Sequence, residues 1–257
     1  MKKGKHFLLL LLLTLCWAPS YFCIKVGVNA LPPFALMFFR VFLAASALIV
    51  YCLLSGKKFW AYKHLWPHFL VMGLAVNAVP FVLIAFGEQA ISSSLAAIIN
   101  GTTPLFALLF GKALLDEKIT FRKILGLTIG FFGVFILYLP DLTAGITGNE
   151  LGILFLILSS VSYGFGAVYA KLHMSQLPPM IAPVWQLIMA SLTLLPFTLF
   201  FDLPQISMPN AYSLSAIAFM SLVGAAFAFI IYYELIRSAG ATFTSLTALL
   251  VPAGAIL

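Results

Sequence analysis

The sequence predicts an all-α, polytopic membrane protein built from two inverted five-helix repeats, with about nine of ten transmembrane helices present. Hydrophobic residues make up 63% of the 257 residues and charged residues only 8%, against about 25% charged residues in an ordinary soluble domain. The apolar residues form long runs bounded by charges, Pro or Gly, and the second half of the sequence resembles the first. These three observations predict the fold.

The composition indicates lipid as the surrounding solvent. Within hydrocarbon every backbone polar group must be paired inside the protein, which leaves α-helices or a closed β-barrel. The apolar runs are longer and more continuous than the alternating strands of about ten residues that barrels use. We therefore expect helical spans near residues 7–28, 34–54, 67–87, 92–111, 122–140, 150–170, 181–201, 213–233 and 240–257.

The first and last spans need separate comment. The first resembles a signal peptide, because Lys2, Lys3 and Lys5 precede an apolar run. We expect it to stay uncleaved, since the run continues to Val28 and is long enough to cross a bilayer. The ninth span reaches Leu257 without a charged stop, so we expect a tenth span beyond that residue.

The basic residues predict the orientation. With the amino terminus in the cytoplasm, twelve of the fourteen Lys and Arg residues fall in or beside cytoplasmic loops; the exceptions are Lys25, at the outer side, and Arg40, within span two. This distribution follows the positive-inside rule and predicts a multi-pass protein of the bacterial inner membrane. The net charge of +7 is then a topological signal, and we expect no nucleic-acid partner.

The sequence contains an internal repeat. Three pairs of residues stand 146 positions apart, namely Trp17 and Tyr163, Lys25 and Lys171, and Pro32 and Pro178. Because five spans per repeat is an odd number, the second copy enters the membrane from the opposite face, as in many secondary transporters. We expect the first repeat to occupy residues 1–140 and the second, lacking its last helix, residues 150–257.

Several short motifs follow one another along nearly the whole chain. They are Trp17 through Lys25, Pro32-Pro33 with Arg40, Ser93, Leu95 and Ala96 before Thr103-Pro104-Leu105, Asp116-Glu117 before Gly126, Gly130 and Gly133-Val134, and Gly240-Ala241 through Pro252. In this order and spacing they resemble the EamA-type, ten-helix members of the drug/metabolite transporter superfamily. The resemblance implies two five-helix bundles around a central cavity and transport of small metabolites by alternating access.

Polar and aromatic side chains inside spans are the candidates for substrate binding, because such groups have to face protein or water. The candidates are Trp17, Tyr21, Arg40, Asn77, Asn100, Thr103, Tyr163, Trp185, Gln186 and Tyr232. Proline within a span bends the helix and frees a carbonyl. The candidate hinge positions are Pro19, Pro80, Pro104 and Pro252.

Each candidate also has a structural interpretation. Arg40 could bind a substrate carboxylate, or it could brace the bundle by donating to helix carbonyls while its charge reaches toward the boundary. Asn100 could contact the substrate or form hydrogen bonds between helices. Trp17 and Tyr163 could line a cavity or pack in the core.

The function that these features favour is secondary transport of small organic metabolites (amino-acid-like, nucleoside-like or drug-like), in the direction of efflux. The alternative is an integral-membrane enzyme or a flippase acting on a lipid-linked substrate. Such an enzyme generally needs clustered acids or His, whereas the four His here are scattered and no HExxH, GxSxG or phosphate loop occurs.

The expected partners follow from the same reading. They are a small-molecule substrate and the lipid bilayer, and the sequence also allows a homodimer. We expect no cofactor and no metal site, since Cys16, Cys23 and Cys52 lack a CxxC spacing. Glu88 and Glu234 are placed near span ends, so the sequence offers no carboxylate deep in the membrane for coupling to protons.

Overall fold

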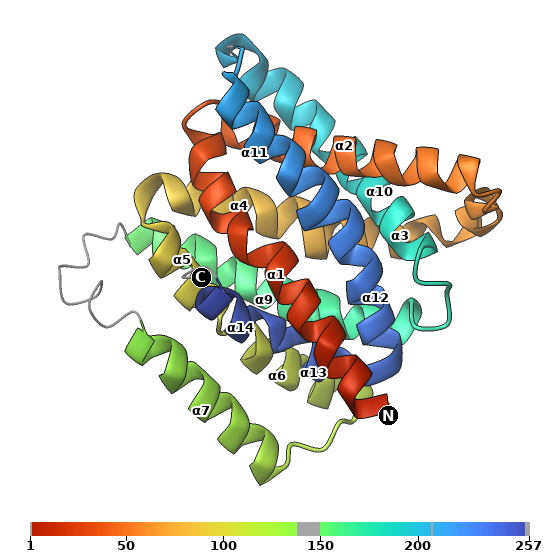
Figure 1. Cartoon of the computed structure of the whole chain (residues 1–257), viewed down its shortest axis with the longest axis vertical. Coiled ribbons are helices and arrows are strands. Elements are labelled where there is room, and N and C mark those ends of the chain that lie inside the picture. The colour runs from red at the N-terminus through yellow and green to blue at the C-terminus, as the bar shows by residue number, and fades with distance from the viewer. Residues whose placement is uncertain (1, 138–149, 207, 255–257) are drawn as a thin grey trace.

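The computed structural model describes residues 2–137, 150–206 and 208–254, and all regular secondary structure within these ranges is helical (Figure 1). Seven of the described helical stretches are long and apolar enough to cross a membrane. The expected all-α, polytopic class is therefore confirmed. The fifth expected span corresponds to a described helix of 17 residues, and the expected end of the span at Pro140 lies outside the described ranges. The ninth corresponds to a shorter apolar stretch, Ala241–Pro252.

The first five expected spans contain a series of helical elements. They are α1 (Lys2–Val28), α2 (Pro33–Leu54), the 3-10 helix η1 (Phe59–Leu65), α3 (Trp66–Gly73), the π-helical η2 (Leu74–Ala78), α4 (Val79–Ala90), α5 (Ser93–Asn100), α6 (Thr103–Leu115) and α7 (Phe121–Leu137). Span three is longer than expected, because η1 to α4 form one helical stretch. Its additional residues include the exposed Trp60 and Trp66, and tryptophan is enriched at the membrane surface.

The second half is organised in a similar way. Its elements are α9 (Glu150–His173), α10 (Ile181–Phe197), the π-helical η3 (Thr198–Asp202), the 3-10 helix η4 (Leu203–Gln205), α11 (Ala211–Ser221), the π-helical η5 (Leu222–Phe227), α12 (Ala228–Ala239), α13 (Ala241–Ser245) and α14 (Thr247–Gly254). The turn between α12 and α13 is at Gly240, whose φ of 94° is a conformation that glycine adopts without a steric penalty.

Helix α9 passes through the middle of the bundle and packs against α4, α5 and α6 (Figure 1). Its approach to α6 depends on Gly164. A Cβ atom on that residue would lie 2.6 Å from Phe106 Cβ and 2.8 Å from the backbone nitrogen of Ala107. The two helices therefore meet backbone against backbone, as small residues allow in membrane bundles.

Helix α7 lies at the edge of the bundle, next to α14 (Figure 1). Gly130 faces that neighbour, since a Cβ there would lie 2.9 Å from Leu249 Cδ1, whereas Gly126 is surrounded by open space. Phe121 and Ile129 are among its exposed apolar side chains. This helix thus presents most of its surface outward, where lipid is the expected neighbour.

Two of the four prolines predicted as hinge positions coincide with helix irregularities. Pro104 lies at the start of α6, directly after the break that separates α5 from α6. Pro80 lies at the start of α4, directly after the π-helical η2. Proline has no N–H to donate to the preceding turn, which accounts for an interruption at each place. Pro19 and Pro252 lie inside α1 and α14.

Candidate functional site: a central aromatic cavity

A cavity of about 90 Å³ lies between the helices that carry most of the candidate residues. Its described wall consists of Trp17, Ser20, Tyr21, Ile24, Arg40, Val76, Phe81, Ile84, Asn100, Thr103, Tyr163, Ala167, Phe229, Tyr232, Thr244, Ser245, Thr247, Ala248 and Val251. One water needs roughly 10–15 Å³ by this kind of measure. The space therefore holds a few waters, and a metabolite would require the surrounding helices to move apart.

Trp17 of α1 links the wall of the cavity to η5. Its indole Nε1 donates to the carbonyl oxygen of Gly224 at 3.0 Å. The ring packs at 6.1 Å from the ring of Phe229 and at 5.9 Å from that of Tyr232. A π-helical turn leaves carbonyls without the usual helical partner, and here a side chain from the other half of the chain supplies one.

Arg40 of α2 lies on the cavity wall with only 3% of its surface exposed. Its guanidinium carbon lies 3.9 Å from the centre of the Phe81 ring, a cation–π arrangement. No described residue forms a salt bridge or hydrogen bond with it, and its buried Nε has no partner. A permanent positive charge is thus held inside the bundle without a counterion in contact.

Asn100 stands where α5 ends beside the cavity. The hydroxyl of Ser159 on α9 donates to its side-chain oxygen at 3.3 Å, and Thr103 donates to its backbone oxygen at 2.7 Å. The Ser160 hydroxyl lies 3.2 Å from the same side-chain oxygen and 3.0 Å from the carbonyl oxygen of Leu156. These bonds fix the amide so that Nδ2 is the free end. That nitrogen has no hydrogen-bond partner within the described structure, and Tyr21 of α1 is a neighbour of the Asn100 side chain. Asn100 therefore serves both as an interhelical link and as part of the cavity wall.

Residues 4–139 and 150–257 match the model of the EamA-like transporter family. The chain belongs to the EamA-like transporter family. The EamA chain is also similar to a solved crystal structure with a TM-score of 0.72 at 17% identity, over 98% of this chain and 85% of that one, which supports the fold.

Three curated relatives are similar to this chain over most of their length, and two of them are named transporters. An uncharacterized transporter of Bacillus subtilis, YoaV, is 23% identical over 93% of this chain and 82% of its own length. The uncharacterized inner membrane transporter YedA of Escherichia coli is 27% identical over 95% of this chain and 78% of its own. Protein PagO of Salmonella typhimurium is 26% identical over 98% and 83%. The EamA protein is accordingly a membrane transporter.

Three candidates from the sequence do not reach the cavity of the EamA protein. Trp185 donates through Nε1 to the carbonyl of Phe59 at 3.0 Å, and its ring stacks on Phe69 at 5.7 Å. Gln186 accepts a hydrogen bond from the Tyr233 hydroxyl. Asn77, in η2, is fully buried away from the described wall. Trp185 and Gln186 therefore contact other helical elements and do not line the described cavity.

The reason is the helical rotation between neighbouring residues. Successive residues on an α-helix point about 100° apart, so Tyr232 reaches the cavity while Tyr233 turns to α10. The position of a residue along a predicted span indicates its depth in the membrane but not the direction in which its side chain points. Among the candidates, those that do line the cavity are Trp17, Tyr21, Arg40, Asn100, Thr103, Tyr163 and Tyr232.

The sequence did not single out Ser20, Phe81 or Phe229, which also line the cavity. Ser20 could have been found, because it lies three residues after Trp17 and therefore on the same helix face. The phenylalanines could not, since the chain has 25 of them and none is distinguished by its neighbours in the sequence.

Two lysines make equivalent contacts in the two halves of the EamA protein. Lys25, near the end of α1, donates to the carbonyls of Glu88 and Ile91 at the end of α4. Lys171, near the end of α9, donates to the carbonyls of Ile236 and Arg237 near the end of α12, each at 3.3 Å. A cation at these helix ends complements the helix dipole.

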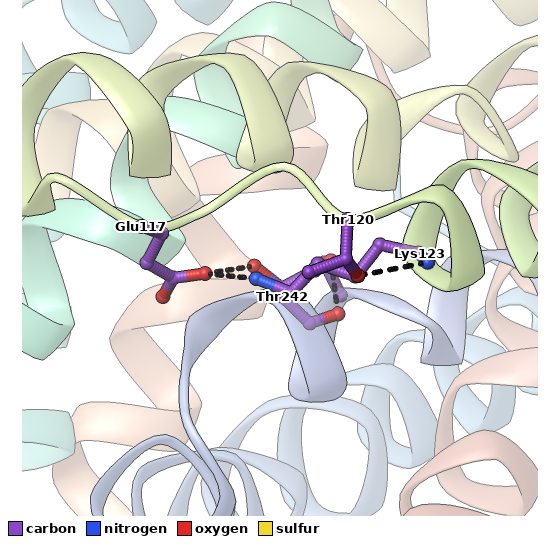
Figure 2. A network of polar contacts seen from close by, with 5 residues as sticks. Glu117, Thr120, Lys123 and Thr242 are labelled. Carbon is purple, nitrogen blue, oxygen red and sulfur yellow. Dashed lines mark hydrogen bonds and ion pairs between the residues drawn. The ribbon is translucent and has the colours of Figure 1, made fainter.

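A polar network lies beside the cavity, near the expected cytoplasmic side (Figure 2). The Glu117 carboxylate accepts hydrogen bonds from Lys123 at 2.8 Å and from Thr242 at 3.0 Å. Burial raises the pKa of Glu117, but these two hydrogen bonds together with the positive charges of Lys123 and Lys171 outweigh burial and hold the pKa below its usual value. Because Ser245 of the cavity wall donates to the carbonyl of Thr242, the network reaches the cavity. We call it the Glu117 network.

The described cavity wall offers no usual metal ligand. It contains no His, Cys, Asp or Glu, and those are the side chains that bind most protein metals. Within the described ranges no group of three such residues comes together elsewhere either. Glu88 is at the end of α4, as expected from the sequence, yet it is fully buried and one of its carboxylate oxygens has no partner.

Proposed function

We propose that the protein is a secondary carrier that moves small organic metabolites out of the cell by alternating access. The observation that carries this proposal is the cavity, whose aromatic and polar wall is contributed by both halves of the chain. A site shared by two repeats is the arrangement from which one half can rock against the other. The chain's family consists of transporters, which agrees with this role.

The equivalent features of the two halves support two repeats, 1–140 and 150–257. The π-helical η2 and η5 begin at Leu74 and Leu222, close to the sequence offset of 146. Each accepts a side-chain hydrogen bond from the first helix of the other half: Ser162 donates to Ala75 O at 2.8 Å, and Trp17 to Gly224 O. The two equivalent lysines obey the same offset.

These cross-half contacts are suited to a moving interface. A π-helical turn is often found at a functional site, and a bond to its carbonyl can break without opening the regular helix ladder. We propose that η2 and η5 absorb the bending when the cavity opens to one side or the other. Export is the proposed direction, with the amino terminus in the cytoplasm.

The enzyme alternative has no support in the cavity or in the relatives' names. Work on a lipid-linked substrate would need a general base or a metal-bound nucleophile at the site. The described wall has only Arg40 and tyrosines as ionisable groups. A carrier is the function that fits the aromatic and polar residues of the cavity wall.

The test is flux through the purified protein in lipid vesicles. Exchange of labelled amino acids, nucleosides and drug-like solutes is measured in both directions, with empty vesicles as background. The variant Ala248→Trp fills the cavity, and Leu109→Trp places the same side chain on an exposed position of α6 as the control. We expect flux with the wild type and Leu109→Trp and background with Ala248→Trp.

Three results would contradict parts of the proposal. One is equal flux with Ala248→Trp and the wild type, which would place the pathway elsewhere. Another is turnover of a lipid-linked substrate with no solute crossing, which would favour the enzyme. Net movement only into right-side-out vesicles would reverse the proposed direction.

A further inference from the structure

The cavity carries a positive charge that nothing in the described structure neutralises by contact. Arg40 is the charged residue of the described wall. It is 3% exposed, its nearest interaction is with the face of Phe81 at 3.9 Å, and no described carbonyl accepts from it. The bracing role considered from the sequence would require such a carbonyl. A buried cation without hydrogen bonds is unfavourable, so a group that supplies them would be bound there.

The surrounding charges do not remove this excess. Glu88 is the acidic residue that interacts electrostatically with Arg40, but it is not part of the described cavity wall. Lys25 lies closer to Glu88, since it donates to the backbone carbonyl of that residue and interacts with its carboxylate. The described wall itself therefore carries the positive charge of Arg40 and no negative charge.

The uncharged polar groups beside Arg40 are donors. Three of the buried polar atoms that lack a partner within the described structure belong to cavity residues, namely Arg40 Nε, Ser20 Oγ and Asn100 Nδ2. Asn100 Nδ2 has no partner within the described structure, whereas the side-chain oxygen of the same amide contacts the hydroxyls of Ser159 and Ser160. Guanidinium, amide N–H and hydroxyl together match a carboxylate, which accepts several hydrogen bonds and donates none.

The rest of the wall suits an apolar body. Aromatic rings of Trp17, Tyr163, Phe229 and Tyr232 surround the cavity together with aliphatic side chains. Such a lining favours a flat or compact hydrocarbon group and fixes its orientation through a few polar contacts. An ammonium group would meet no described carboxylate on the wall.

We propose that the substrates are organic anions with one carboxylate and a small aromatic or aliphatic body, and that Arg40 binds the carboxylate with Ser20 and Asn100 beside it. This specificity rests on the proposed carrier function. It makes Arg40 the residue that discriminates an acid from the corresponding amide or amine. The carboxylate accepts hydrogen bonds from the guanidinium, and the aromatic wall takes the place of the water around the apolar body of the solute.

The test is equilibrium binding to the purified protein in lipid nanodiscs, with three probes of one shape: benzoate, benzamide and benzylammonium. We expect benzoate to bind most tightly and to raise the melting temperature of the wild type. Arg40→Gln should weaken benzoate binding by at least about tenfold, the size expected for a hydrogen-bonded charge, and should leave benzamide binding nearly unchanged. Arg40→Lys should retain part of the affinity, and Arg122→Gln, an exposed arginine at the start of α7, should retain all of it.

The outcomes separate this proposal from the carrier function. Tighter binding of benzamide or benzylammonium than of benzoate by the wild type would overturn it, even if Arg40→Gln does not fold. An unchanged ratio of benzoate to benzamide affinity in Arg40→Gln would also overturn it. Because binding is measured here and flux in vesicles, benzoate binding without flux of any solute would contradict the carrier alone.

Discussion

The close approach of α6 and α9 should be intolerant of one methyl group. In Gly164→Ala the new Cβ would lie 2.6 Å from Phe106 Cβ and 2.8 to 2.9 Å from backbone atoms of α6. Backbone atoms cannot rotate away as a side-chain end can, so the helices must separate. Overpacking costs about 1–3 kcal/mol, and replacing a helical glycine by alanine returns about 0.5–1 kcal/mol. We expect a net loss of about 1 kcal/mol or more.

The measurement is thermal unfolding of the purified protein followed by intrinsic fluorescence. A loss of 1 kcal/mol lowers the melting temperature by about 2–4 °C in a chain of this size. The matched control is Gly126→Ala on α7, where a Cβ meets nothing within 4 Å, and it should be neutral or stabilising. Gly164→Ala melting at or above the temperature of Gly126→Ala would refute the backbone contact. The neighbouring Tyr163 should also shift, so benzoate binding should weaken in Gly164→Ala.

Three further predictions follow from polar contacts and topology. Because its neighbours lower the pKa of Glu117 in the folded state, its charge stabilises the protein above the pKa of an unfolded glutamate and less as the pH falls through the folded value. Glu117→Gln should therefore be less stable than the wild type at pH 7 by well under 1 kcal/mol, and this difference should shrink as the pH falls below the usual pKa of a glutamate. The exposed Asp116→Asn should stay neutral. Lys25→Met and Lys171→Met should destabilise by similar amounts, about 0.3–1 kcal/mol each; a large inequality would argue against equivalent halves. Met208 is 97% exposed, so the new thiol in Met208→Cys should react with an impermeant thiol reagent in intact cells. Reaction only in inside-out vesicles would show that the topology is opposite to the predicted one.

Hydropathy and charge predict the helical spans well for a physical reason. A chain in hydrocarbon has to pair its own backbone, so each long apolar run becomes a helix. Local irregularities are harder to predict. Pro104 marks the break between α5 and α6 and Pro80 follows η2, but no proline or other residue type marks the π-helical turn η5.

The sequence predicts which residues lie within the membrane spans, but only in part which of their side chains point into the cavity. Arg40, Asn100 and Trp17 line the cavity because polar and amphipathic groups at mid-membrane have to face the protein interior. Trp185, near the start of α10, was a candidate by the same argument but stacks on Phe69. That choice is made by α3, a neighbour in space, and a single sequence does not show which helices become neighbours.

Passage of solute by alternating movement of the two halves is tested most directly by locking the Glu117 network. Cys16, Cys23 and Cys52, which are buried and free, are first replaced, and Glu117→Cys and Thr242→Cys are then introduced. A short bis-methanethiosulfonate reagent forms a disulfide with each of the two new thiols, releasing methanesulfinate, and so joins them through a reducible link. Flux of a transported solute is then measured before cross-linking, after it and after reduction. We predict that cross-linking stops the flux and that reduction restores it. Undiminished flux through fully cross-linked protein would contradict the proposed mechanism.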